Sequence, residues 1–202
     1  MRRLLIFLKY PTPGLVKTRL AASIGERAAS DVASACAELT LARLARFREA
    51  AILYLDPPEA LAPTRAWLGP DWRLRPQHGP TLGERLAAAF AEAFDEGAHR
   101  VIAIGTDSPW LEPHEIETAF NVLEQAELTV GPTEDGGYYL LGLSQPQPRL
   151  FEGILWGTTS VYADTLAQAA RLGLRVQTLR LGYDLDRVDD LDRFITTGGR
   201  HA

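Results

Sequence analysis

The segment LLIFLKYPTPGLVKTRL, residues 4–20, joins a short apolar run to a loop that contains two prolines, a glycine and several basic residues. The apolar run covers residues 4–8 and is bounded by Arg3 and Lys9, as is typical of a buried central strand. The prolines and Gly14 exclude a helix from the first half of the loop, residues 9–20. The segment therefore predicts a strand that ends in a basic loop.

The rest of the chain alternates between strand-like and helix-like apolar patterns. Further strands are expected at residues 51–55, 72–75, 101–104, 128–130, 138–143 and 175–179, and helices at about 25–47, 59–68, 81–97, 112–125, 160–172 and from 189 onward. Because the helices are long enough to connect parallel strands, this alternation predicts an α/β fold, a mostly parallel sheet covered by helices on both faces. The Asp135-Gly136-Gly137 turn is expected to introduce an irregular or antiparallel strand. No repeat, linker or low-complexity tract divides the chain, so residues 1–202 are expected to form one domain.

The composition excludes several classes of protein. The chain has 202 residues, 46% of them hydrophobic and 23% charged, which fits one compact soluble domain. Cys36 is the single cysteine, so an internal disulfide and a structural zinc site are excluded. The net charge of -5 disfavours nucleic acid as a partner. The N-terminal apolar run is too short for a signal peptide and no other segment approaches a membrane span, so a cytoplasmic protein is expected.

The first loop gathers basic residues directly after a strand. Ligands of parallel sheets bind where loops leave the carboxyl ends of the strands. Lys9, Lys17 and Arg19 are therefore interpreted as a phosphate site, in which Gly14 lets the backbone approach the ligand. The glycine spacings of the Walker and G-x-G-x-x-G motifs are absent, which argues against a P-loop and a dinucleotide cofactor. The alternative is a solvated basic loop without a ligand.

Acidic residues follow two other predicted strands. Asp107 comes just after the strand at 101–104, and Asp186 lies in the acidic segment 183–191 after the last strand. Two carboxylates together with phosphate oxygens suit Mg²⁺ or Mn²⁺, so Asp107 and Asp186 are the predicted metal ligands. Asp184 is an alternative to Asp186, and Asp189 is better explained as the N-cap of the last helix. Turn carboxylates that bond backbone amides are the alternative for both predicted ligands.

Residues 134–139 place two acids, two glycines and two tyrosines in a third loop. This segment is interpreted as an acceptor pocket in which Asp135, or Glu134, acts as general base and Tyr138 stacks on a flat or sugar-like ligand. A tight turn with core tyrosines explains the same residues equally well. The remaining candidates are Gly136, Gly137 and Trp156 for the acceptor, and Gly83 and Glu84, at the start of a helix, for the nucleotide.

Four motifs follow one another in an order that resembles a bacterial family of GT-A-type, glycosyltransferase-like proteins. They are PTPGLVKTRL (residues 11–20), GTDSP (105–109), EDGGYYLLGL (134–143) and DLDRVDDL (184–191), so the resemblance spans nearly the whole chain. The family lies within the nucleotide-diphospho-sugar transferase superfamily, and some members are linked to arsenosugar biosynthesis. The resemblance implies a single GT-A domain, a Rossmann-like three-layer sandwich, with a nucleotide held by the loop at residues 9–19 and a divalent metal at Asp107. By analogy with sugar-activating cytidylyltransferases, Asp186 would be the second metal residue, although Arg187 departs from the related Asp-x-Asp-Thr-Pro pattern.

Two reactions fit these residues. In glycosyl transfer, the metal and the basic loop neutralise the departing nucleoside diphosphate while Asp135 takes the acceptor proton. In nucleotidyl transfer, the same groups bind a triphosphate and pyrophosphate leaves. The lone Asp107, in place of a paired Asp-x-Asp, and the loop cations favour nucleotidyl transfer, whereas the resemblance favours glycosyl transfer to a small-molecule acceptor, which is placed first. A nucleotide-binding sensor without turnover is the third hypothesis. The sequence leaves the oligomeric state open.

Overall fold

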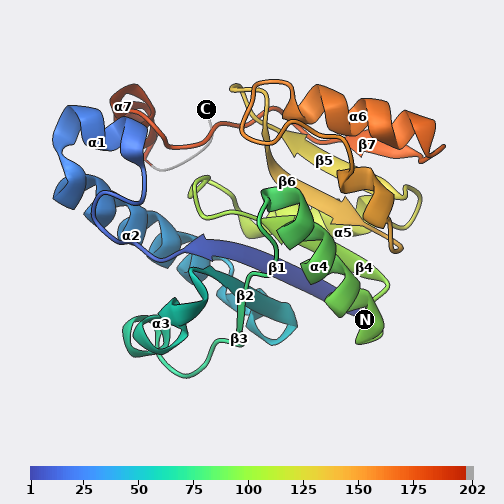
Figure 1. Ribbon diagram of the computed structural model, residues 1–202, viewed down its shortest axis with the longest axis horizontal. Helices are drawn as coiled ribbons and strands as arrows, with labels where there is room; N and C mark the ends of the chain where they lie inside the picture. Colours follow the sequence, from blue (N-terminus) through green and yellow to red (C-terminus); the bar gives the residue numbers. More distant parts are fainter. Residues whose placement is uncertain (199–202) are drawn as a thin grey trace.

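One seven-stranded sheet organises the computed structural model, which describes residues 1–198 (Figure 1). The strands are β1 (Arg2–Lys9), β2 (Ala51–Asp56), β3 (Leu74–Pro76), β4 (Arg100–Ile104), β5 (Leu128–Pro132), β6 (Tyr138–Leu143) and β7 (Val176–Thr178). Their order across the sheet is β3-β2-β1-β4-β6-β5-β7. Strand β6 runs antiparallel to β4 and β5, and the other strand pairs are parallel. The antiparallel strand predicted after the Asp135-Gly136-Gly137 turn is therefore confirmed.

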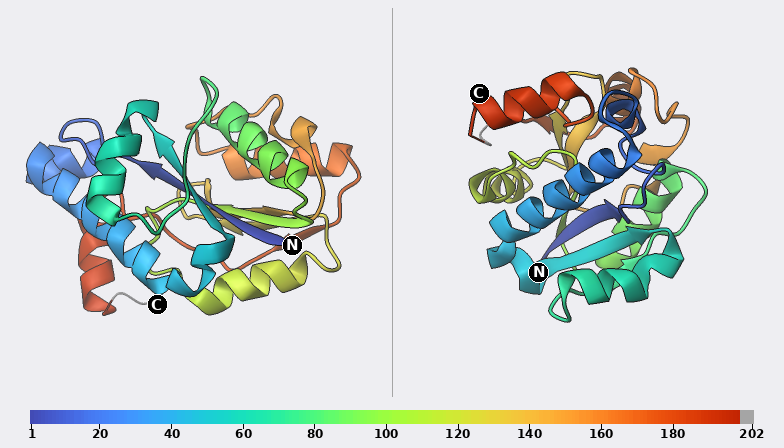
Figure 2. Two further views of the ribbon diagram at one scale, coloured as in Figure 1. Left: turned by 90° about the horizontal axis from the view of Figure 1, so that it is seen from below. Right: turned by 90° about the vertical axis from the view of Figure 1, so that its left-hand side faces the viewer.

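Helices cover both faces of the sheet. They are α1 (Thr18–Ile24), α2 (Glu26–Arg43), α3 (Leu61–Leu68), α4 (Leu82–Asp95), α5 (Pro113–Val122), α6 (Val161–Arg171) and α7 (Val188–Thr196), with 3-10 helices at Ala45–Ala50, Pro58–Ala60 and Pro148–Phe151. Side chains alternate along a strand, so Leu4 and Ile6 of β1 pack with α2 and α5, while Leu5 packs with α4 and α6. Helices α4 and α5 lie on opposite sides of the sheet (Figure 2, left). The predicted three-layer α/β sandwich is confirmed; residues 199–202 of the predicted 1–202 domain lie outside the described part.

Helix α1 differs from the sequence-based expectation. The loop after β1 was expected to extend to residue 20, but the helix begins at Thr18. Its Leu20 is fully buried with Ala29, Cys36 and Leu185, next to α7. Helices α1 and α7, from opposite ends of the chain, therefore lie side by side (Figures 1 and 2). Tertiary packing, rather than local propensity, accounts for a helix of this length.

The start of α7 also differs from the expectation that Asp189 caps it. The helix begins at Val188, so Asp189 lies inside its first turn. The cap is supplied by Asp190, whose Oδ2 accepts hydrogen bonds from the backbone N–H groups of Asp186 and Arg187 at 3.0 and 2.7 Å. The turn that carries Asp186 is thus fixed by Asp190, without the Thr-Pro pair of the related pattern.

The topology brings the candidate loops to one edge of the sheet. The strand order changes direction between β1 and β4, where the chain reaches neighbouring positions by separate crossovers. Because β6 is antiparallel, its first residue, Tyr138, lies at the same edge as Lys9 and Ile104, the last residues of β1 and β4. Within residues 1–198, no helix combines the length and the apolar character needed to cross a membrane.

Candidate active site

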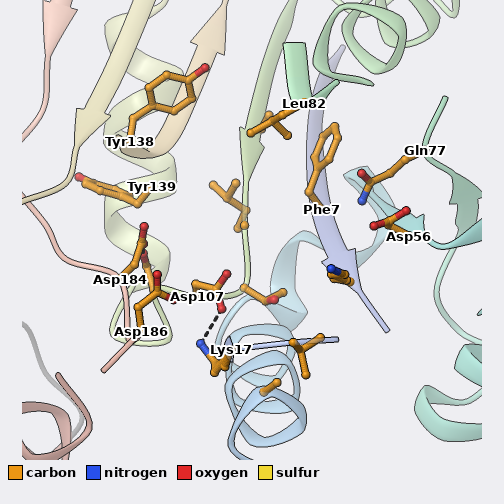
Figure 3. Close-up of a pocket in the computed structure, with 18 of the residues that line it drawn as sticks. Phe7, Lys17, Asp56, Gln77, Leu82, Asp107, Tyr138, Tyr139, Asp184 and Asp186 are labelled. Atoms are coloured by element: carbon orange, nitrogen blue, oxygen red, sulfur yellow. Dashed lines mark hydrogen bonds and ion pairs between the residues drawn. The ribbon is translucent and has the colours of Figure 1, made fainter. Parts of the chain in front are cut away.

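A cavity of about 570 Å³ opens at this edge, where β1 and β4 end and β6 begins (Figure 3). Its wall is formed by Phe7, Lys9, residues 15–19, Ala33, Asp56, Gln77, Leu82, Leu86, residues 103–108, Tyr138, Tyr139, Leu141, Asp184 and Asp186. Asp107, Asp184, Asp186 and Lys17 gather at one end, and aromatic and apolar side chains line the rest together with Asp56 and Gln77. Such a concave site with a few converging polar groups is suited to a small-molecule ligand.

Lys17 is the cation at the centre of the acidic end. It is the N-cap of α1 and adopts a left-handed backbone conformation, with φ of 43° and ψ of 47°. Its side chain is only 3% exposed, and Nζ lies 2.6 Å from Asp107 Oδ1 and 2.6 Å from the carbonyl oxygen of Leu185. Burial alone would lower the pKa of Lys17, but the charge and hydrogen bond of Asp107 outweigh it and raise the pKa. Lys17 therefore stays charged and joins the first loop, the loop after β4 and the segment before α7.

The acidic residues of this end come from two segments that bond to each other. The backbone N–H of Leu185 donates to the carbonyl of Asp107 at 2.8 Å, and Ser108 Oγ donates to Asp184 Oδ1 at 2.6 Å. Asp186 Oδ2 lies 3.4 Å from Arg19 NH1. These contacts bring Asp107, Asp184 and Asp186 to the same end of the cavity.

Burial and mutual repulsion both disfavour the charged forms of Asp184 and Asp186. Burial, together with the charges of Asp107, Asp186 and Asp135, raises the pKa of Asp184 to about 7, although the hydrogen bond from Ser108 opposes the shift. Burial and the charge of Asp107 likewise raise the pKa of Asp186, against the effects of Lys17 and Arg19. These carboxyl groups are therefore less easily ionised than exposed ones, and a further cation beside them would lower these pKa values.

An excess of carboxylate oxygen fits a hard divalent cation. Mg²⁺ and Mn²⁺ prefer oxygen ligands, and one or two carboxylates suffice where phosphate oxygens complete the coordination. Asp107 and Asp186 offer such oxygens, so the residues present fit the predicted ion. The described residues contain no cluster of three or more His, Cys, Asp or Glu side chains with the geometry of a complete protein metal site. A metal here would depend on ligand oxygens.

The residues predicted to bind the nucleotide divide into two groups. Lys9, Lys17 and Arg19 line the cavity, whereas Gly14, Gly83 and Glu84 are not among its wall residues. Each of the second group has a local explanation. Gly14 has a φ of 80° and lies against the Glu26 side chain, and a Cβ on Gly83 would lie 2.4 Å from Trp156 Nε1. Glu84 accepts hydrogen bonds from Thr81 N and Oγ1 as part of the capping box of α4.

The predicted acceptor loop forms a tight turn before β6. Asp135 Oδ1 accepts from Thr133 Oγ1 at 2.7 Å and from Gly137 N at 3.1 Å. A Cβ on Gly136, which has a φ of 87°, would lie 2.0 Å from the carbonyl oxygen of Thr159. The turn explanation thus accounts for Asp135, Gly136 and Gly137.

The other acceptor candidates lie in different surroundings. Glu134 forms an ion pair with Arg193 at 3.0 Å. Tyr138 lines the cavity, and its ring meets the Trp156 ring edge-on at 6.4 Å between centroids. Asp135 remains near the acidic cluster, since its charge contributes to the raised pKa of Asp184 and Asp186. Asp135 as general base and Tyr138 as stacking residue stay predictions.

Sequence reasoning overlooked the opposite end of the cavity, which is lined by Phe7, Asp56, Gln77 and Leu82. A signal for Asp56 was present. It is the last residue of β2, directly after an apolar run, which is the same relation that directed attention to Asp107 after β4. The two prolines that follow Asp56 also end the strand there.

The sheet order, the antiparallel β6 and the cavity at the carboxyl edge define a protein of the nucleotide-diphospho-sugar transferase fold. The chain belongs to the family described as "Uncharacterized protein conserved in bacteria (DUF2064)", whose model matches residues 40–158. No curated protein matches the chain. The GT-A family assignment and the link to arsenosugar biosynthesis stay predictions.

Solved structures share this fold over almost the whole chain. A "putative nucleotide-diphospho-sugar transferase" from Desulfovibrio desulfuricans G20 is 36% identical, with a TM-score of 0.92 over 98% of this chain and 87% of its own. A CMP:2-keto-3-deoxy-manno-octonic acid synthetase complexed with CTP is 10% identical, with a TM-score of 0.62 over 98% of both chains. Rv0371c of Mycobacterium tuberculosis H37Rv, in complex with manganese, is 18% identical, with a TM-score of 0.62 over 98% of this chain and 100% of its own. The last two structures are similar to this chain in fold alone.

Proposed function

We propose that this chain is a divalent-metal-dependent transferase that moves a glycosyl group from a nucleotide-sugar to a small acceptor. The observation that carries the proposal is the convergence of Asp107, Asp186 and the basic loop on one cavity. A nucleotide-sugar carries a diphosphate, and a chain of net charge -5 can attract it only through a local group of cations. Lys9 and Arg19 are exposed at the cavity wall and supply that group.

The comparisons support a nucleotide substrate and a metal. The 36% identical structure is described as a "putative nucleotide-diphospho-sugar transferase". Among proteins of the same fold, one is complexed with CTP and another with manganese. A bound Mg²⁺ or Mn²⁺, held here by Asp107 and Asp186, would neutralise charge on the diphosphate.

In the proposed reaction, the bond between the anomeric carbon and the diphosphate oxygen breaks, and its electron pair leaves with the nucleoside diphosphate. A bond forms between the anomeric carbon and an acceptor oxygen, whose proton passes to a carboxylate. Arg19 and Lys9 bind the departing phosphates, and Arg19 can do so with two parallel donors. Asp135 is our candidate for the base, because only its Oδ1 is used in the turn bonds to Thr133 and Gly137.

Nucleotidyl transfer is the second candidate. The sequence positions of the two proposed metal ligands favour this reaction. Asp107 and Asp186 come from separate segments of the chain rather than from one Asp-x-Asp pair. The state of Lys17 favours glycosyl transfer instead. Its ammonium is buried against Asp107 and Leu185, which leaves Lys9 and Arg19 as the exposed cations of the loop. The loss of one loop cation to a buried pair lowers the positive charge available to the phosphates, which favours the smaller charge of a diphosphate over that of a triphosphate.

The product released from a nucleotide decides between these reactions. The purified protein is incubated with Mn²⁺, a small alcohol or sugar acceptor, and either nucleotide-sugars or nucleoside triphosphates. Nucleoside diphosphate released from a nucleotide-sugar supports glycosyl transfer. Pyrophosphate released from a triphosphate would establish nucleotidyl transfer in its place, and metal-dependent binding without either product would indicate a sensor.

Replacement of the proposed metal ligands tests the site itself. Asp107→Asn and Asp186→Asn are each expected to lower turnover by on the order of 100-fold or more, because charge on the departing phosphates is no longer neutralised. Asp107→Asn also removes the anionic partner of the buried Lys17, so its melting temperature should fall. Asp31→Asn, which changes an exposed acid paired with Arg27, serves as the control. Near-normal turnover in both site variants would refute the proposed role.

A further inference from the structure

The end of the cavity away from the acidic cluster carries a different set of side chains. In Figure 3, Phe7, Asp56 and Gln77 gather there with Leu82, while Lys17, Asp107, Asp184 and Asp186 lie at the other end. We propose that this end is a nucleobase subsite that selects guanine, and that the Asp56 carboxylate accepts hydrogen bonds from the base. This inference rests on the proposed function, because it assumes that the diphosphate of a nucleotide occupies the acidic end.

The parallel pairing of β1 and β2 builds the subsite. Lys9 pairs with Asp56 and Phe7 with Tyr54 in the register of the two strands. Side chains two residues apart share a face, so Tyr54 and Asp56 point to the α4 side of the sheet together with Phe7. The Phe7 ring stacks on the Tyr54 ring, with centroids 5.5 Å apart and an interplanar angle of 17°. Phe7 is thereby a supported apolar wall next to a carboxylate, and a flat ring can pack against such a wall.

The carboxylate of Asp56 is held in place from the side of α4. Arg85 NH1 lies 3.1 Å from Asp56 Oδ1, and the same guanidinium donates to the carbonyl of Gly79 at 2.9 Å and to Gln77 Oε1 at 3.3 Å. Gln77 Nε2 in turn donates to the Tyr54 carbonyl at 2.9 Å. The Arg85 and Gln77 donors beside Asp56 are thus directed at protein acceptors, and Asp56 presents an acceptor to the cavity.

An acceptor of this kind discriminates among the bases. Guanine carries two neighbouring donors on one edge, N1–H and the N2 amino group, which a carboxylate accepts together. Adenine and cytosine place a ring acceptor beside their amino group, and uracil places a carbonyl oxygen on either side of its N3–H. Each of these acceptors would face the negative charge of Asp56. A site whose hydrogen bonds match one base rejects another strongly, because polar groups are then left unpaired.

The spacing of the strands separates the two ends of the cavity by about the length of a nucleotide. Strand β1 lies between β2, which ends at Asp56, and β4, which precedes Asp107. Neighbouring strands are about 4.8 Å apart, so the ends of β2 and β4 are separated by about 10 Å. That separation suits a nucleoside diphosphate whose base lies near Asp56 and whose phosphates reach the exposed Arg19 at the acidic end.

Binding measurements with diphosphates of five bases test the inference. Calorimetric titration of the whole protein in Mn²⁺ compares GDP, ADP, UDP, CDP and xanthosine diphosphate, in native protein and in Asp56→Asn. We expect the native protein to bind GDP about tenfold or more tightly than the others. The variant should lose roughly 10- to 100-fold in GDP affinity and should prefer xanthosine diphosphate, because the new amide can donate to the second carbonyl of xanthine. Asp71→Asn, which removes a surface carboxylate 3.1 Å from Arg48, is the matched control.

Each outcome decides the question. A gain in affinity for xanthosine diphosphate supports the inference and cannot come from loss of fold. If Asp56→Asn does not fold, the ranking of the five nucleotides by the native protein decides. Metal-dependent binding with a pyrimidine or adenine preferred, or an equal loss for every base in the variant, would overturn the guanine assignment and leave the proposed function standing. If no nucleoside diphosphate binds, both fail.

Discussion

Lys17 illustrates how one side chain can serve structure at a site predicted for a ligand. Its ammonium is buried, and it contacts Asp107 and the carbonyl of Leu185. A buried ammonium is costly unless it is paired and hydrogen-bonded, and both partners here come from distant parts of the chain. The sequence predicts phosphate binding for Lys17, because it is a basic residue in a loop that follows a strand. Nothing in the local sequence indicates that this lysine is buried.

Gly136 offers a residue-scale test of the turn that precedes β6. Its φ is 87°, and an added Cβ would lie 2.0 Å from the carbonyl oxygen of Thr159. Gly136→Ala should therefore destabilise the protein by about 3 kcal/mol or more, since a backbone clash adds to the cost of a left-handed residue. Gly157→Ala, also at positive φ but with nothing within 4 Å of the added Cβ, should cost only about 1 kcal/mol. The measurement is urea unfolding, and equal losses in the two variants would show that the turn does not pack on Thr159 as described.

At the scale of elements, the strands are more predictable than the helix ends. The runs at 4–8, 51–55 and 101–104 are short and apolar, and they correspond to β1, β2 and β4 within two residues at each end. The sequence of helix α1 has no comparable apolar pattern. The helix is stabilised instead by contacts of Leu20 with Leu185 and α2. Local sequence carries no information about those contacts.

The candidate site shows the same division. Asp107, Asp186, Lys9 and Arg19 lie at strand ends or in the loops that follow strands, and the topology brings them to one cavity, as the sequence analysis expected. The nucleotide-binding roles expected for Gly83 and Glu84 require that the first turn of α4 face the cavity. The structure uses Gly83 to admit Trp156, and it uses the Glu84 side chain as a cap. Such packing is determined by residues distant in sequence.

The junction of β5 and β7 gives an element-scale prediction about pH. Arg175 binds both carboxylate oxygens of Glu127 and lowers the pKa of Glu127 from 4.5 to about 2. The native protein therefore keeps Glu127 ionised at pH values where the unfolded chain has taken up a proton. The stabilisation is present above pH 4.5 and is lost as the pH falls towards 2. It is small, because Arg175 is 71% exposed.

In Glu127→Gln the stability lost between pH 5 and pH 3 should be smaller than in the native protein, as measured by urea unfolding at each pH. Glu152→Gln, at an exposed position in another loop, should leave the native pH dependence unchanged. An acid dependence in Glu127→Gln that equals the native one would show that the pair with Arg175 does not contribute to folding.

At the scale of the whole molecule, the site joins segments that span almost the full chain. The DUF2064 model matches residues 40–158, which include Asp107 but neither the basic loop nor Asp186. The outer segments are brought together by the packing of α1 on α7 and by the bonds from Lys17 to Asp107 and Leu185. The cavity is therefore complete only when both ends of the fold are docked, and a ligand that bridges the acidic end should stabilise that docked state.

This linkage predicts that Mn²⁺ and GDP stabilise the protein cooperatively. A ligand that binds only the native state at 100 times its Kd adds about 2.7 kcal/mol, which for a chain of this size raises the melting temperature by about 5–10 °C. Because Asp107 and Asp186 would share the cation with phosphate oxygens, the shift with both ligands should exceed the sum of the separate shifts. In Asp186→Asn the excess should vanish while the shift with GDP alone remains. Strictly additive shifts in the native protein, or an undiminished excess in the variant, would mean that metal and nucleotide do not meet at the acidic end of this cavity.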